Sequence, residues 1–106
     1  MSTVLLLESC NLYQKKIKQI FTTDKLSYVK LFICNCYTQI FEYLLKNKIN
    51  YIIISDDNIE NDSFWDKIKE ISSVVKIIII STKISAQNIM TWTSRGVYDL
   101  IDKRQE

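Results

Sequence analysis

The sequence predicts an α/β fold, a doubly wound parallel sheet of five strands with helices on both faces. Five short aliphatic runs recur at similar intervals along the 106 residues. Each run is continuous rather than alternating, as is typical of strands that are buried on both faces. The stretches between the runs show helical spacing of apolar residues. Strands and helices therefore alternate, and the connections are long enough for right-handed crossovers between parallel strands.

The five predicted strands are short and rich in isoleucine, leucine and valine. In chain order they are Val4–Leu7, Val29–Ile33, Ile52–Ile54, Ile77–Ile80 and Leu100–Ile101. Between them the sequence predicts four helices, each with an apolar stripe at helical spacing. The stripes are Leu12, Ile17, Ile20 and Phe21; then Ile40, Phe41, Leu44 and Leu45; then Phe64, Trp65, Ile68 and Ile71; and a weaker one at Ile89, Met90 and Trp92.

Local signals mark where the last two helices begin and end. Ser63, with Asp66 three residues later, resembles a capping arrangement at the start of the third helix. Ser85 is a suitable N-cap for the fourth helix. Gly96 is the only glycine in the chain, and it follows that helix where a left-handed residue is favoured.

The composition excludes several classes of function. Because the chain has no histidine, it has no imidazole metal ligand and no histidine-based catalytic triad. The chain has three cysteines, Cys10, Cys34 and Cys36, which is an odd number, and the sequence shows no secretory segment. We therefore expect reduced thiols in a cytoplasmic protein rather than disulfides. The net charge of +2 is too small to indicate a nucleic-acid or membrane surface by itself. No apolar run approaches the roughly 20 residues that a membrane-spanning helix needs.

Polar residues follow the predicted strands where the carboxyl ends of a parallel sheet meet, which is where ligands of such folds bind. Glu8 follows the first strand, Asp56 and Asp57 follow the third, Ser81 the fourth and Lys103 the fifth. A carboxylate can act as a nucleophile toward phosphorus, and acids can hold Mg²⁺ through their oxygens. Lysine and hydroxyl groups can donate to phosphate oxygens. These residues are suited to handling a phosphoryl group.

The last strand and its flanks carry a resemblance to a known family. Residues 96–103 have the sequence Gly-Val-Tyr-Asp-Leu-Ile-Asp-Lys. This segment resembles Gly-Ala-x-Asp-Tyr-Leu-x-Lys in the receiver domains of two-component response regulators. The resemblance extends from Val4 to Lys103. It implies a flavodoxin/CheY-like fold with strand order 2-1-3-4-5, and a signalling domain rather than an enzyme, with at most self-phosphorylation and dephosphorylation chemistry.

The resemblance also implies a role for each polar residue. Asp56 resembles the phosphoacceptor, with Asp57 as the competing candidate. Glu8 resembles the first metal-binding acid, so Mg²⁺ would be held by Glu8 and Asp56. Ser81 resembles the switch hydroxyl, and Lys103 the lysine that senses the phosphate. The implied partners are a sensor histidine kinase, a second copy of the chain, and a DNA-binding or other effector domain outside this chain.

The chain departs from the family pattern at the site and at the switch. Ser9 stands where the family has a second acid, which weakens Mg²⁺ binding because hard cations depend on ligand charge. Thr82 stands where alanine is usual, and Leu100 replaces the aromatic that reports phosphorylation, with Tyr98 as a doubtful substitute. Arg104 replaces the proline that follows the lysine.

Other interpretations of the same residues remain open. Asp56 could be a loop or capping carboxylate, and Glu8 could be a solvent-facing loop acid. Lys103 could form a structural ion pair with Asp56. The role of Ser81 could be limited to hydrogen bonds with nearby backbone groups. The chain could then be a pseudo-receiver, a phosphorylation-independent dimerisation or docking module. A flavin or phosphate-carrier domain is a third hypothesis, disfavoured because no glycine-rich phosphate loop is present.

The predicted elements end at the fifth strand, whereas a receiver domain continues into a fifth helix. We therefore expect residues 1–106 to be a receiver domain truncated before that helix, or the N-terminal part of a longer regulator. In either case, aliphatic surface beside the first helix should be uncovered unless a second copy covers it.

Overall fold

The computed structural model describes residues 2–21, 29–59 and 63–104. Its strands are β1 (Ser2–Leu7), β2 (Val29–Cys34), β3 (Tyr51–Ser55), β4 (Lys76–Ser81) and β5 (Asp99–Asp102). Its helices are α1 (Asn11–Phe21), α2 (Tyr37–Lys46), α3 (Ser63–Ile71) and α4 (Ala86–Ser94), with a short 3₁₀ helix, η2 (Asp56–Asn58), after β3. All strands pair in parallel in the order β2-β1-β3-β4-β5, which confirms the predicted fold and strand order.

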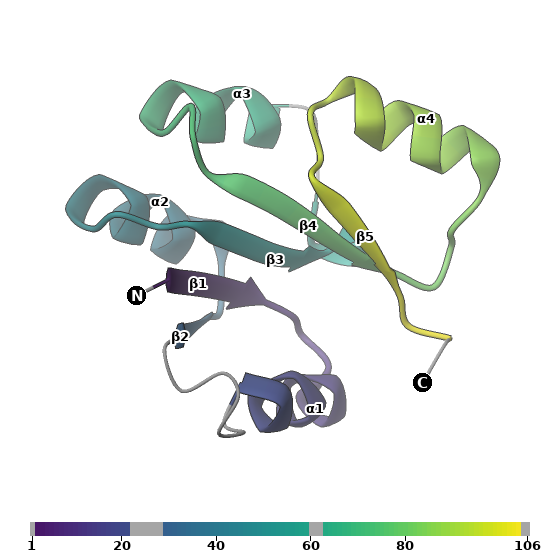
Figure 1. Cartoon of the computed structure of the whole chain (residues 1–106), viewed down its shortest axis with the longest axis horizontal. Coiled ribbons are helices and arrows are strands. Elements are labelled where there is room, and N and C mark those ends of the chain that lie inside the picture. The colour runs from purple at the N-terminus through teal and green to yellow at the C-terminus, as the bar shows by residue number, and fades with distance from the viewer. Residues whose placement is uncertain (1, 22–28, 60–62, 105–106) are drawn as a thin grey trace.

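The helices lie on both faces of the sheet, in unequal numbers. Among the described elements, α1 lies on one side, and α2, α3 and α4 lie on the other (Figure 1). The buried apolar residues form two clusters accordingly. The larger contains Leu5, Ile52 and Ile79 with α2 and α3, and the smaller contains Val4, Ile53 and others with α1. This alternation along each strand explains why the aliphatic runs are continuous.

The strand register aligns the carboxyl ends of the strands. Leu7 pairs with Ile54 across β1 and β3, and Ser55 pairs with Ile80 across β3 and β4. Ser81 then pairs with Asp102 across β4 and β5. The residues that follow β1, β3, β4 and β5 consequently meet at one edge of the sheet.

The predicted helix stripes are buried to different extents. Phe64, Trp65 and Ile68 of α3 are all buried, as the sequence predicts. In α1 only Ile17 is buried among the described residues, while Leu12 and Ile20 are 70% and 54% exposed. The physical reason is that α1 has no neighbouring helix among the described elements of its face, so it contacts the sheet along one line.

The ends of α4 follow the predicted chemistry. The Ser85 side chain accepts a hydrogen bond from the Asn88 backbone N–H at 3.2 Å, as an N-cap does. Gly96 has a φ of +85°, which side chains with a Cβ adopt only at a cost. The predicted cap at Ser63 differs, because Ser63 is already the first residue of α3 and the N-cap position lies outside the described residues. None of the described helices has the length and hydropathy needed to span a membrane.

Candidate functional site

The carboxyl edge of the sheet brings together four of the five residues that the sequence singled out. Glu8 follows β1, Asp56 begins the 3₁₀ helix after β3, Ser81 is the last residue of β4, and Lys103 directly follows β5. Lys103 is anchored there by its backbone N–H, which donates to the Ser81 carbonyl at 2.9 Å. The site is thus assembled from the carboxyl ends of four different strands, each contributing a polar group at or just beyond its last residues.

Ser81 is joined directly to Asp56. Its hydroxyl donates to Asp56 Oδ2 at 2.7 Å, and Ser81 Oγ accepts a hydrogen bond from the Lys83 backbone N–H at 2.8 Å. Ser81 is fully buried and Asp56 is partly buried. The orientation of the hydroxyl is therefore fixed: its proton points toward the Asp56 carboxylate, and its oxygen accepts a hydrogen bond from the backbone.

Lys103 and Glu8 form the second pair of the site. Lys103 Nζ lies 2.7 Å from Glu8 Oε2, and the other carboxylate oxygen accepts the Cys10 backbone N–H at 3.0 Å. Glu8 is only 2% exposed, so the interpretation of Glu8 as a solvent-facing loop acid is wrong. The ion pair of Lys103 is made with Glu8 rather than with Asp56, although β3 and β4 separate β1 from β5 in the sheet.

Three contacts of this site were missed by the sequence analysis. Lys103 Nζ lies 3.4 Å from the hydroxyl of buried Ser55, and 5.1 Å from the centre of the Tyr13 ring. The Gln14 side chain donates to the Glu8 carbonyl. Ser55 interrupts an isoleucine run one residue before Asp56, and that polar interruption was the available signal. Tyr13 and Gln14 carried no such signal, because they lie in the polar part of α1.

The acids of the site give a sparse set of metal ligands. No group of three or more acidic or cysteine side chains that could hold a metal lies within residues 2–21, 29–59 and 63–104. Glu8 and Asp56 supply carboxylate oxygens, the ligands that Mg²⁺ prefers, and Mg²⁺ takes its remaining ligands from water or phosphate. The donor chemistry therefore fits Mg²⁺, but Lys103 competes for one Glu8 oxygen.

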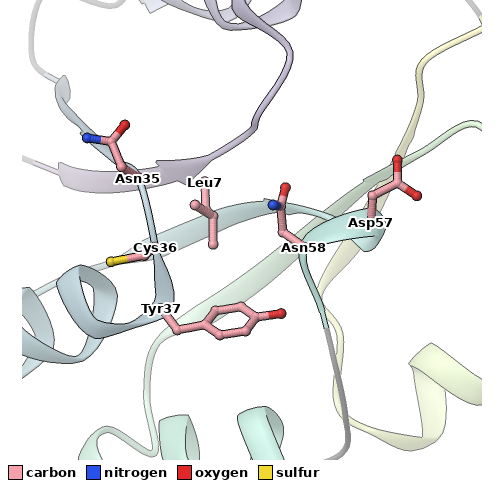
Figure 2. A pocket seen from close by; sticks show the side chains of 6 residues that line it. All are labelled: Leu7, Asn35, Cys36, Tyr37, Asp57 and Asn58. Carbon is pink, nitrogen blue, oxygen red and sulfur yellow. The ribbon is translucent and has the colours of Figure 1, made fainter.

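Asp57, the competing acceptor, has different surroundings. Its side chain is exposed, and it lines a hollow of about 190 Å³ beside the site (Figure 2). The other lining residues come from the end of β1, the β2–α2 connection, the start of α2 and the end of η2: Leu7, Asn35, Cys36, Tyr37 and Asn58. Figure 2 shows the Asp57 carboxylate on the far side of Asn58 from Cys36. Asp57 thus lies beside the site formed by Glu8, Asp56, Ser81 and Lys103, and not within it.

The positions that depart from the family pattern are also visible. Thr82 is exposed beside Ser81, and Leu100 is half-buried against the larger apolar cluster. Tyr98 is 57% exposed at the opposite end of the sheet, where its ring lies 6.1 Å from Tyr51. Tyr98 directly precedes β5, whereas the site lies at the carboxyl end of this strand. The Tyr98 ring is therefore too far from the site to replace the switch aromatic.

Solved structures with similar coordinates identify the fold. No family model matches the chain, and no curated protein matches it. A two-component response regulator from Clostridium difficile superposes with a TM-score of 0.81 at 14% identity, covering 100% of this chain and 86% of that one. A CheY-like receiver domain from Methanospirillum hungatei gives 0.78 at 13% identity, with 100% and 84% covered. The chain therefore has the fold of response regulator receiver domains.

Two further structures bear on metal and on other uses of this fold. The Mn²⁺-bound form of the response regulator Rcp1 superposes with a TM-score of 0.78 at 13% identity, covering 100% of this chain and 84% of that one. A protein from Sinorhizobium meliloti, provisionally described as a pilus assembly protein, gives 0.77 at 8% identity, with 98% and 89% covered. The fold thus occurs in proteins described in different terms.

Proposed function

We propose that the chain is a signalling receiver that accepts a phosphoryl group on Asp56 from a sensor histidine kinase. The observation that supports Asp56 most directly is its hydrogen bond with the buried Ser81 hydroxyl, at 2.7 Å. An Asp56 oxygen would attack phosphorus as the phosphorus–nitrogen bond to the kinase histidine breaks, giving an acyl phosphate on the carboxylate. Asp57, which is exposed and lines the neighbouring hollow, lacks these partners among the described residues.

The surrounding residues would then stabilise the added charge. The Ser81 hydroxyl can turn its proton from Asp56 to a phosphate oxygen without moving far, because its oxygen is already held by the Lys83 backbone N–H. Lys103 would have to leave Glu8 to reach the phosphate. Phosphorylation would therefore exchange one ion pair for another and shift an existing equilibrium in the segments that carry Ser81 and Lys103.

Mg²⁺ belongs to this proposal as a weakly held cofactor. Glu8 and Asp56 would hold the ion, and its charge would offset the charge of the incoming phosphoryl group. The Mn²⁺-bound Rcp1 structure, which has the same fold, supports the binding of a divalent cation. Ser9 leaves the site with one carboxylate fewer than the family pattern, so we expect a dissociation constant for Mg²⁺ in roughly the millimolar range.

The proposal is tested by treating the protein with acetyl phosphate and Mg²⁺ and measuring its intact mass. We expect one added phosphoryl group, which Asp56→Asn abolishes and the matched control Asp57→Asn retains. An adduct that survives Asp56→Asn but disappears in Asp57→Asn would reassign the acceptor. A folded protein that gains no mass with acetyl phosphate, and does not bind beryllofluoride at millimolar Mg²⁺, would overturn the proposal.

The Glu8–Lys103 ion pair favours a second candidate, a pseudo-receiver that acts without phosphorylation as a docking or dimerisation module. In that role the buried pair would stabilise a single conformation of the site, with no metal needed. The pilus assembly protein of similar fold supports the idea that this scaffold is used in other settings. Absence of an adduct, together with partner binding or self-association that is unchanged in Asp56→Asn, is the outcome expected for this candidate.

A further inference from the structure

The Lys103 side chain contacts three different elements at the carboxyl edge of the sheet. Its ammonium group lies 2.7 Å from Glu8 Oε2, just beyond β1. It donates a hydrogen bond to the Ser55 hydroxyl, at the end of β3, over 3.4 Å. It also lies 5.1 Å from the centre of the Tyr13 ring, in the first turn of α1. Because the lysine side chain is only 14% exposed, these protein groups replace much of the water around it.

The contact with Glu8 attracts the ammonium group but does not orient it. Although the two charged atoms are close, no hydrogen bond reaches Glu8 Oε2 from any residue that the structure describes. The other carboxylate oxygen accepts the Cys10 backbone N–H, and the Gln14 side chain donates to the Glu8 carbonyl. Glu8 is therefore fixed by its own loop and by α1. The direction of the Lys103 side chain depends on its other two contacts.

Tyr13 and Ser55 are placed to provide that direction. Ser55 is 1% exposed, and it points to the same face of β3 as Ile53, two residues earlier. Ile53 belongs to the apolar cluster beside α1, against which Tyr13 also packs, and α1 lies on this face of the sheet (Figure 1). An aromatic face attracts a cation, and a buried hydroxyl offers a fixed acceptor. Both groups therefore draw Lys103 to the α1 side of the sheet.

Asp56 has a separate set of contacts. Its Oδ2 atom accepts the Ser81 hydroxyl at 2.7 Å, and within the described ranges no ion pair joins Asp56 to Lys103. The acceptor carboxylate and the lysine are thus held apart, although both lie at the same edge of the sheet. To reach a phosphoryl group on Asp56, Lys103 would have to break its three present contacts. The strength of those contacts would then determine how readily the lysine moves.

We propose that Tyr13 and Ser55 are positioning residues, which hold the Lys103 ammonium group beside Glu8 in the resting protein and oppose its transfer to the phosphoryl group. The transfer rests on the proposed phosphorylation of Asp56, whereas the resting position of Lys103 does not. The role depends on the aromatic face of Tyr13 and on the oxygen of Ser55, rather than on the volume of either side chain. Variants that keep the volume or the chemical group therefore distinguish it from packing alone.

The first test measures the resting position by NMR, without phosphate or metal. Protons beside an aromatic face are shifted upfield, so we expect an upfield-shifted Lys103 Hε signal in protein with isotope-labelled lysine, assigned with Lys103→Arg. Tyr13→Phe should keep this shift, and Tyr13→Leu should remove it. Lys76 is the matched control: its Nζ lies 4.7 Å from the Tyr98 ring, so its signal should respond to Tyr98→Leu and not to Tyr13→Leu. An unshifted Lys103 signal in the wild type, or a shift that survives Tyr13→Leu, would overturn the proposal.

The second test measures the transfer of the lysine with beryllofluoride, which mimics a phosphoryl group on a carboxylate, in the presence of Mg²⁺. Removal of the ring should release Lys103 more readily, so Tyr13→Leu should bind beryllofluoride about threefold more tightly than the wild type, as measured by fluorine NMR. Tyr13→Phe keeps the ring and should bind as the wild type does. Ser55→Ala removes the acceptor and should also bind more tightly, by about twofold. Equal affinities of Tyr13→Leu and Tyr13→Phe would contradict the positioning role.

Together the two tests distinguish failure of this role from failure of the proposed function. If no protein binds beryllofluoride while the Lys103 signal behaves as expected, Tyr13 does hold the lysine at rest, and it is the phosphorylation of Asp56 that fails. If all bind it equally, the phosphorylation site is supported and the positioning role is wrong. Circular dichroism of each variant checks that the fold is retained, since Tyr13 is half-buried and Ser55 is buried.

Discussion

Lys103 Nζ and Glu8 Oε2 lie 2.7 Å apart, and both side chains are largely removed from solvent, at 14% and 1% exposed. Removal of either partner leaves an uncompensated charge at a buried position, which is far more costly than the net contribution of the pair. We expect Lys103→Met to lower the free energy of unfolding by about 3 kcal/mol. The double variant Glu8→Gln with Lys103→Met should lose less than Lys103→Met alone. Urea denaturation of the wild type, Glu8→Gln, Lys103→Met and the double variant measures the coupling free energy between the two side chains.

Arg104→Met is the matched control for that cycle. Arg104 also pairs with an acid, Asp102, at 2.9 Å, but its side chain is 60% exposed. Hydrogen bonds from the Arg104 guanidinium and from the Arg104 backbone N–H hold the pKa of Asp102 below its usual value. An exposed pair contributes little, so Arg104→Met should leave the denaturation midpoint almost unchanged. A loss comparable to that of Lys103→Met would show that burial does not determine the effect.

Ser81→Ala should destabilise the protein and alter the site at Asp56. The substitution removes the donor to Asp56 Oδ2 and the acceptor of the Lys83 backbone N–H. Because the Ser81 oxygen is fully buried, we expect a loss of about 1–2 kcal/mol in the free energy of unfolding. Ser81→Thr keeps the hydroxyl and should recover most of this loss. Chemical denaturation measures both, and equal stability of the alanine and threonine variants would argue against the hydrogen bonds as the cause.

The sequence was most informative where local chemistry and tertiary structure agree. Continuous aliphatic runs predicted the strands, and Ser85 and Gly96 predicted the ends of α4, because capping and positive φ depend on neighbouring residues only. The partner of Lys103 could not be predicted in this way. It depends on which acid lies nearest in three dimensions, and the sequence analysis named Asp56, whereas the structure pairs Lys103 with Glu8.

The same distinction explains the helix stripes. The apolar spacing of α1 and α3 is similar in the sequence, yet Phe64, Trp65 and Ile68 are buried in α3, and Ile17 is the only buried residue in α1 among those described. Burial depends on the number of neighbours that a helix has: α3 contacts α2, and its buried residues share the larger apolar cluster with strand residues. Periodicity specifies which face of a helix is apolar, but not how much of that face is covered.

The three cysteines should differ in reactivity and in their effect on stability. Cys10 and Cys36 are exposed and Cys34 is buried. Burial, with a smaller contribution from the neighbouring Cys36, raises the pKa of the Cys34 thiol to about 11. Because the thiolate is the nucleophile, a disulfide reagent at pH 8 should modify two thiols quickly and the third only on unfolding. Rapid reaction of all three thiols in the folded protein would contradict the assigned burial.

The raised pKa of Cys34 also predicts a dependence of stability on pH. The folded protein holds the Cys34 proton more tightly than the unfolded chain, whose thiol titrates near 9. The stabilisation is therefore fully present below pH 9 and is lost as the pH rises toward about 11. Between pH 8 and pH 11 the denaturation midpoint of the wild type should fall relative to that of Cys34→Val, because the variant has no thiol to ionise at this position. The matched variant Cys10→Val should follow the wild type.

Ser9→Asp should strengthen divalent metal binding at the proposed phosphorylation site. The substitution adds a carboxylate next to Glu8, and the affinity of oxygen-ligand sites rises with the charge of their ligands. We expect a decrease of about tenfold in the dissociation constant for Mg²⁺ or Mn²⁺, measured by calorimetry. Ser94→Asp, at the exposed end of α4, adds the same charge elsewhere and should leave the affinity unchanged. Equal effects of the two variants would mean that the gain reflects net charge, and no gain in either would mean that a carboxylate at position 9 does not reach the metal.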